Sequence, residues 1–158
     1  MRTEPQSLVR AVDSMFADTK ERPWDALIER LLRHFDCDVG TVHLLDDRDG
    51  QLHLAAQRGL PPFVLDKVNV IPIGKGMAGI AAERKAPVQV CNLQTDASGV
   101  VRPGAKMTEM KGSLAAPMLT NGELRGVLGV AKPAAYEFSP AETQLLMDIG
   151  TRVAAHLR

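Results

Sequence analysis

The feature that most constrains this fold is a turn at Asn121-Gly122 between two runs of alternating apolar residues. Asn-Gly favours a type I′ turn, because both residues tolerate positive φ angles, and the twist of that turn matches an antiparallel hairpin. The sequence therefore predicts strands at about 113–120 and 123–131, joined by two residues.

A second hairpin is predicted earlier in the chain. Residues 37–45 and 51–57 alternate in the same way around Asp46-Asp47-Arg48-Asp49-Gly50, which is turn chemistry. Shorter elements are expected between the two hairpins: a helical stretch at 61–68, extended segments at 70–73 and 87–91, a short helix at 77–84, and a long polar connection at 92–110 with one helical turn after Pro103.

Apolar residues recur at helical spacing near both ends of the chain. We expect helices over 6–19, from Pro23 to about Phe35, and from Pro140 onward, with Pro23 in the first turn of its helix. Ser139 followed by Glu142 three residues later predicts a capping box. Strands grouped between helices indicate the α+β class, an antiparallel sheet with helices packed on it.

Composition limits the classes of function. The 158 residues suit one domain, with 45% hydrophobic and 24% charged residues. Lys plus Arg equals Asp plus Glu at 19 each, so the net charge is zero, which argues against a nucleic-acid binder. No apolar run approaches the roughly 18 residues of a membrane span, and no signal peptide is present. Two cysteines without CxxC spacing favour a cytoplasmic protein with reduced thiols.

Five motifs, in their order and spacing, resemble the GAF domain family. They are Cys37 to Leu45 with the turn Asp46 to Gly50, Ile73-Gly74-Lys75-Gly76-Met77-Ala78-Gly79, Gly112 to Met118, Gly122 to Val130, and Phe138-Ser139-Pro140-Ala141-Glu142. The resemblance covers residues 23–158, and residues 1–22 would form a separate amphipathic helix for dimerisation.

The resemblance implies a six-stranded antiparallel sheet with the terminal helices on one face. The other face would hold a pocket under the short helices and the long connection at 92–110. Members of the family sense small molecules, usually as dimers and usually attached to an output domain. No output domain follows here, and the start at Met1 favours a stand-alone regulator with a signalling protein as partner over an excised piece.

On this resemblance the chain is expected to be a non-catalytic sensor with an unidentified small-molecule ligand, no metal and an unknown cofactor. The terminal helices would pair with each other and with a second copy in a four-helix bundle. Candidate pocket residues come from the first hairpin, the short helix, the long connection and the strand after it: His43, His53, Met77, Ile80, Cys91, Asp96, Met107, Glu109, Met110, Lys111 and Ser113. The strand register, which decides which of the hairpin residues face the pocket, stays open.

Three local patterns have competing interpretations. Gly74 to Gly79 matches GxGxxG, but the preceding segment contains Pro72 and the helix is short, so a tight turn with close packing is expected instead of a dinucleotide site. His43 and His53 would make a two-ligand metal site only if they faced each other across the hairpin. Lys132, Phe138 and Glu142 match part of the motif of cyclic-nucleotide-binding GAF domains, while Ala131 and Thr143 depart from it; the surviving charges allow a Lys132–Glu142 brace.

Two alternative functions remain. One is a dimerisation scaffold with a collapsed pocket and no ligand, whose dimer a charge at Val12 or Ile149 would abolish. The other is a thiol enzyme like the free methionine-(R)-sulfoxide reductases, whose cysteines would fall near Ala78 and in the segment 92–110. Neither place holds a cysteine here, since the two are Cys37 and Cys91, and covalent bilin attachment lacks its cysteine for the same reason.

Overall fold

The computed structural model describes residues 5–17, 22–98, 101 and 103–157. Within them the chain forms an antiparallel six-stranded sheet in the order β3-β2-β1-β6-β5-β4. The strands are β1 (Val39–Asp46), β2 (Gln51–Arg58), β3 (Val70–Ile71), β4 (Val88–Val90), β5 (Gly112–Thr120) and β6 (Glu123–Lys132). Both predicted hairpins are present, and their inner strands β1 and β6 pair at the centre of the sheet.

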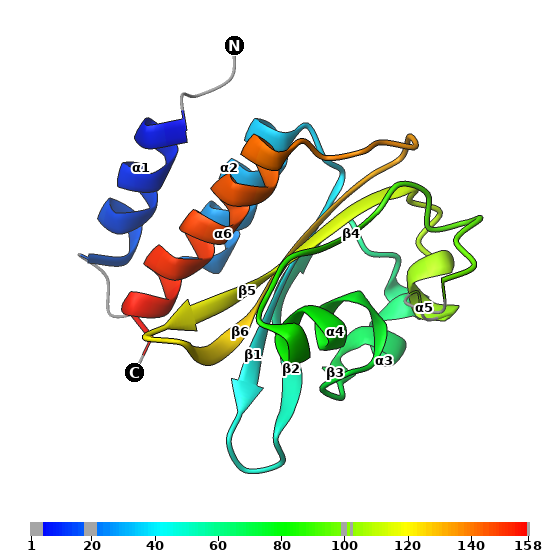
Figure 1. Cartoon of the computed structure of the whole chain (residues 1–158), viewed down its shortest axis with the longest axis horizontal. Helices are drawn as coiled ribbons and strands as arrows, with labels where there is room; N and C mark the ends of the chain where they lie inside the picture. Colours follow the sequence, from blue (N-terminus) through cyan, green and yellow to red (C-terminus); the bar gives the residue numbers. More distant parts are fainter. Residues whose placement is uncertain (1–4, 18–21, 99–100, 102, 158) are drawn as a thin grey trace.

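The helices divide between the two faces of the sheet (Figure 1). The long helices α1 (Pro5–Ala17), α2 (Trp24–Phe35) and α6 (Pro140–Ala155) cover one face. The short helices α3 (Leu65–Val68), α4 (Gly76–Arg84) and α5 (Pro103–Lys106), with a 3₁₀ turn at Pro62–Val64, lie on the other. The predicted α+β class and layer arrangement are therefore confirmed. None of the helices within the described residues is long and apolar enough to span a bilayer.

The predicted hairpin turn and the predicted capping box both form. Asn121 and Gly122 have φ angles of 51° and 79°, as a type I′ turn requires. The Ser139 hydroxyl accepts a hydrogen bond from the Glu142 amide at 3.1 Å, and the Glu142 carboxylate accepts one from the Ser139 amide at 2.9 Å. This capping box fixes the first residue of α6.

Two predicted boundaries are corrected, and a third is not tested. Pro23 is the N-cap of α2 and precedes its first turn, because the helix begins at Trp24. Cys37 does not lie in β1, since Asp36 adopts a left-handed conformation (φ 54°) that ends α2, and the strand begins at Val39. Helix α1 ends at Ala17, and the predicted end at Thr19 lies outside the described residues.

The apolar stripes of the terminal helices are buried within one chain. Val12 of α1 and Ile149 of α6 are both 0% exposed and belong to the core between the helices and the sheet. A charge at either position would therefore disturb the packing of the monomer itself, and the predicted loss of a dimer stays a prediction.

The glycine motif forms a turn with close packing, in agreement with the sequence interpretation. Gly74 and Gly76 have φ angles of 87° and 66°. A Cβ at Gly79 would lie 2.4 Å from the carbonyl oxygen of Pro72, so only glycine lets α4 pack this closely on the preceding segment.

Candidate functional site

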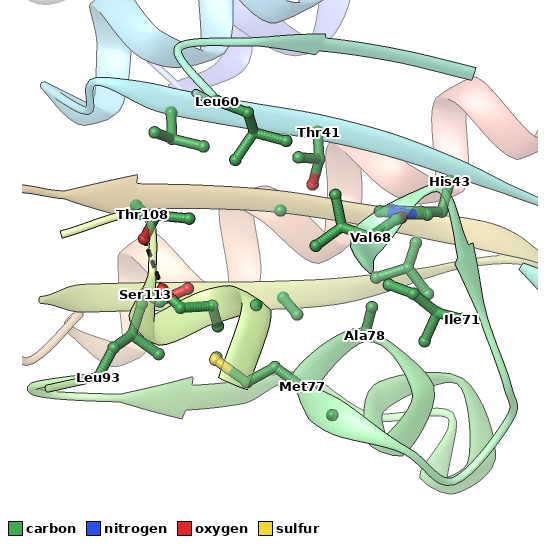
Figure 2. Close-up of a pocket in the computed structure, with 18 of the residues that line it drawn as sticks. Thr41, His43, Leu60, Val68, Ile71, Met77, Ala78, Leu93, Thr108 and Ser113 are labelled. Atoms are coloured by element: carbon green, nitrogen blue, oxygen red, sulfur yellow. Dashed lines mark hydrogen bonds between the residues drawn. The ribbon is translucent and has the colours of Figure 1, made fainter. Parts of the chain in front are cut away.

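A cavity of about 130 Å³ lies between the sheet and the short helices (Figure 2). The sheet forms its floor and α3, α4 and the segment around α5 form its walls. The lining is mostly apolar, with polar side chains from Thr41, His43, Lys67, Thr108 and Ser113.

Strand register places alternate residues of three neighbouring strands on the floor. Thr41 and His43 of β1 pair with Gly129 and Val127 of β6. Paired residues of antiparallel strands point to the same face, so all four line the cavity. Gly129 leaves room for its neighbour, since a Cβ there would lie 2.6 Å from the Thr41 hydroxyl. The remaining floor residues that alternate in this way are Val39, Ser113, Ala115 and Ala131.

The walls come from segments that are short and separated in sequence. Leu60, Val68 and Ile71 follow the first hairpin, and Met77 and Ala78 belong to α4. The long connection contributes Leu93, Gly104, Ala105 and Thr108. The prediction that the short helices and this connection cover a pocket on this face is therefore confirmed as geometry.

His43 is the buried polar group of the floor, with 3% of its surface exposed. Its Nε2 lies 2.7 Å from the carbonyl oxygen of Val68. A carbonyl only accepts, so Nε2 carries the proton and Nδ1 of the neutral ring is an acceptor. Burial lowers the pKa of His43 below its ordinary 6.5, which keeps the ring neutral. Nδ1 is buried and has no hydrogen-bond partner among the described residues.

The other polar side chains of the lining differ in their hydrogen bonds and in their exposure to solvent. The Thr108 hydroxyl donates to the carbonyl oxygen of Ala105 at 2.6 Å and accepts from the Met110 amide at 3.1 Å, so it is committed to the turn after α5. The Ser113 hydroxyl makes a long contact of 3.4 Å with the carbonyl oxygen of Val130. Lys67 is exposed. The lining is thus mostly apolar, with one neutral imidazole, three hydroxyls and the exposed Lys67.

Of the predicted pocket residues, three line the cavity: His43, Met77 and Ser113. The other eight lie outside its lining: His53, Ile80, Cys91, Asp96, Met107, Glu109, Met110 and Lys111. Ile80 packs one turn further along α4, in the small core between that helix and the sheet.

The polar residues of the long connection are used by the connection itself. Asp96 accepts hydrogen bonds from the Ser98 amide and hydroxyl, at 3.2 and 2.5 Å. The Met110 carbonyl accepts from Gln94, and the Lys111 main chain pairs with Leu93 and Lys132. Met107 and Glu109 are exposed. These hydrogen bonds hold the connection itself together, and none of its predicted pocket residues lines the cavity that it covers.

His43 and His53 point to opposite faces of the sheet. His43 pairs with Leu54, and His53 pairs with Leu44, because the register shifts between Val42 and His43. His53 therefore lies on the face of Leu44, a residue that packs against the helix-side core. The two-histidine metal site required them to face each other, and this register excludes it.

Another set of possible metal ligands lies at the tip of the first hairpin, where Asp46, Asp49 and His53 have donor atoms within 4.8 Å of one another. The His53 Nε2 lies 2.7 Å from an Asp49 oxygen. Arg48 donates to both oxygens of Asp46, at 3.1 and 2.9 Å, and these hydrogen bonds lower the pKa of that carboxyl to about 2. Both oxygens of Asp46, the one possible ligand here that comes from β1, are therefore already hydrogen-bonded to the Arg48 guanidinium.

Neither cysteine lies at the cavity. Cys37 is buried in the core on the helix side, and its burial raises the pKa of the thiol to about 12. Cys91 is exposed just after β4 and does not line the cavity. A thiol with a pKa of about 12 is almost wholly protonated at neutral pH, so Cys37 is a poor nucleophile.

Lys132, from the partial nucleotide-binding motif, is buried at the end of β6. Its ammonium donates to the carbonyl oxygens of Phe35 and Asp36 at 2.6 and 3.0 Å, and it lies 4.5 Å from the centre of the Tyr136 ring. The Glu142 carboxylate accepts from the Tyr136 hydroxyl at 2.7 Å as well as closing the capping box. Lys132 therefore satisfies the carboxyl end of α2, a structural use of the motif lysine.

Sequence reasoning missed most of the lining, including Thr41, Leu60, Lys67, Val68 and Thr108. Thr41 carried a usable signal, since it lies two residues before His43 on the same strand and must share its face. Leu60, Lys67 and Val68 reach the cavity only through the path of the chain after β2, which no periodicity encodes.

The family model for the GAF domain matches residues 24–158. No curated protein matches the sequence. Among solved structures, the GAF domain of a phosphoenolpyruvate-protein phosphotransferase from Coxiella burnetii is similar, with a TM-score of 0.82, 21% identity, and coverage of 97% of this chain and 92% of that one.

A second similar structure is the GAF domain of the phosphoenolpyruvate-protein phosphotransferase from Acinetobacter, with a TM-score of 0.80, 20% identity, and coverage of 99% and 93%. A third is the free methionine-R-sulfoxide reductase of Neisseria meningitidis in complex with its substrate, with a TM-score of 0.77, 19% identity, and coverage of 96% and 87%. At these identities the likeness shows the fold alone. The family model spans most of the chain, and this protein therefore belongs to the GAF domain family.

Proposed function

We propose that this GAF domain is a non-catalytic sensor that binds a small molecule in the cavity between the sheet and the short helices. One observation carries the proposal: the cavity floor holds a neutral, buried imidazole whose Nδ1 has no partner among the described residues. An unpaired buried acceptor costs about 1–3 kcal/mol, and a ligand donor would remove that cost.

Signalling would follow from closure of the walls. Apart from the nine-residue helix α4, the walls are the four-residue helices α3 and α5 and a long connection, which contribute little regular structure of their own. A ligand that contacts them together with the sheet favours the closed arrangement through its differential affinity, and so biases the packing of the rest of the domain.

The proposal includes a homodimer and a signalling protein as partner. The groove between α1 and α6 supports the first, because its exposed rim carries Arg10 and Arg152 beside Asp148, charges that a two-fold related copy would complement. Sedimentation of the wild type and of Asp148→Lys tests it. We expect a dimer that the substitution weakens, and a monomeric wild type would contradict the proposed homodimer.

A cytoplasmic location also belongs to the proposal, because both cysteines are free thiols.

The two alternatives have less support. A scaffold with a collapsed pocket does not account for a cavity of about 130 Å³. A reductase of the sulfoxide class needs a thiol at the pocket, and neither Cys37 nor Cys91 lines it. Activity that survives replacement of both cysteines by serine would end the thiol hypothesis.

A thermal-shift screen of small metabolites against three proteins tests the sensor proposal. Ala78→Leu fills the cavity from α4, and Ala141→Leu adds the same volume at an exposed helical position of α6. We expect compounds that raise the melting temperature of the wild type and of Ala141→Leu, but not of Ala78→Leu. Either no stabilising compound, or equal stabilisation of Ala78→Leu, would contradict the proposal.

A further inference from the structure

The state of the His43 ring defines what a ligand must offer. The carbonyl oxygen of Val68 holds the proton on Nε2, which leaves Nδ1 as a buried acceptor without a partner among the described residues, on a side chain that lines the cavity floor. A ligand group facing this atom gains a hydrogen bond only if it is a donor. Figure 2 shows the His43 ring beside Val68, with Thr41 two residues back along the same strand.

The charge of the lining sets a second condition. Lys67, at an exposed position, is the sole fully charged side chain among the described lining residues, and the other polar groups are His43 and three hydroxyls. Burying a charge without a buried partner is costly, whereas burying a neutral group costs little once it is hydrogen-bonded. The enclosed part of the cavity therefore favours an uncharged ligand.

The volume sets a third condition. About 130 Å³ corresponds to roughly four water molecules at about 30 Å³ each. An engineered apolar cavity of about 150 Å³ in another protein accommodates benzene. A single ring or a short aliphatic chain fits this space.

We propose that the ligand is a small neutral alcohol or phenol, whose apolar body fills the cavity and whose hydroxyl donates a hydrogen bond to Nδ1 of His43. The hydroxyl of Thr41 lies on the same face of β1 and offers the ligand oxygen a second contact. This inference rests on the proposed sensor function and narrows the class of molecule sensed.

The experiment compares isosteric probes by ligand-observed NMR or calorimetry. Phenol and toluene differ by a hydroxyl in place of a methyl group, and n-butanol and butyrate differ in charge. We expect phenol to bind the wild type roughly five- to tenfold more tightly than toluene, the worth of one hydrogen bond. We also expect n-butanol to bind more tightly than butyrate.

The variant His43→Phe should bind phenol and toluene equally. His53→Phe, the same substitution on the opposite face of the sheet, should keep the preference of the wild type. The wild-type comparison needs no variant, so the test holds even if His43→Phe fails to fold.

Each contrary outcome overturns a defined part. If toluene binds as tightly as phenol, the proposed hydrogen bond from the ligand to His43 is wrong. If butyrate binds more tightly than n-butanol, the proposal that the ligand is uncharged is wrong. Failure of all four probes, with another compound stabilising the wild type but not Ala78→Leu, would overturn this ligand class and leave the sensor proposal standing. Failure of every compound in that screen would remove the sensor proposal itself.

Discussion

His43 and Val68 are joined by a hydrogen bond of 2.7 Å between the imidazole Nε2 and the main-chain carbonyl oxygen. The bond connects a central strand of the sheet with the last residue of α3, and so connects the floor of the cavity with one of its walls. A ligand at Nδ1 would act on the same ring from its other nitrogen. His43 is thus the residue through which an occupied floor can be coupled to the position of a wall.

Stability should fall in mildly acidic solution because of His43. Its pKa in the folded protein is below 6.5, chiefly through burial, so the unfolded chain takes up a proton that the folded chain does not. The contribution is fully present above pH 6.5 and is lost as the pH falls from 6.5 through the folded pKa, with a slope of at most about 1.4 kcal/mol per pH unit.

Urea unfolding of the wild type and His43→Gln at several pH values measures this contribution. Gln keeps a donor for Val68 but does not titrate, so the decline over this window should shrink. His53→Gln, at a half-exposed position, should keep it. An identical decline in His43→Gln would show that another group causes it.

Lys132→Met should destabilise the domain by about 1.5–3 kcal/mol, because two buried carbonyl oxygens at the end of α2 lose a charged donor. Lys85→Met is the matched control: Lys85 also donates to a carbonyl oxygen, that of Gly122 at 2.7 Å, but lies in solvent. Its cost should stay within about 0.5 kcal/mol. Equal losses in the two variants, measured by urea unfolding, would contradict the role given to Lys132.

Ser139→Ala should cost about 1 kcal/mol through loss of the hydroxyl that caps α6. Ser14→Ala, at an exposed position inside α1, should be neutral or slightly stabilising, because alanine has the higher helix propensity. Thermal unfolding of both variants checks the pair, and a loss at Ser14 equal to that at Ser139 would show that the capping box adds nothing.

Val12→Asp should undock α1 from the chain that carries it. A carboxylate at a position with 0% exposure has no partner in the apolar core, and the expected cost is about 3–5 kcal/mol. Hydrogen exchange over residues 5–17 should accelerate, whereas Arg10→Asp, on the exposed side of the same helix, should leave it unchanged. Slow exchange retained in Val12→Asp would contradict the packing of α1 on α6.

The fold could be predicted from local signals that tertiary contacts reinforce. Asn121-Gly122 specifies its hairpin because both residues accept positive φ, and Ser139 with Glu142 specifies the start of α6 for an equally local reason. Strand boundaries were harder to predict. Cys37 continues the apolar alternation of β1, but it directly follows Asp36, whose left-handed conformation ends α2, and it therefore lies outside the strand.

The site was harder to predict, because its members depend on register and on the path of loops. A shift of register between Val42 and His43 decides that His43 faces the cavity while His53 does not. In the long connection, polar residues such as Asp96 form hydrogen bonds within turns. The small residues Gly104 and Ala105 line the cavity instead. No sequence period distinguishes these two uses.

The central claim, that a small molecule occupies this cavity, is tested most directly by hydrogen–deuterium exchange of the wild type with and without the most stabilising compound from the screen. The account predicts slower exchange in the walls, over residues 65–68, 76–78 and 103–108, and no such change in Ala78→Leu. Slowing confined to α1 and α6, with the walls unchanged, would place the molecule elsewhere and contradict the account.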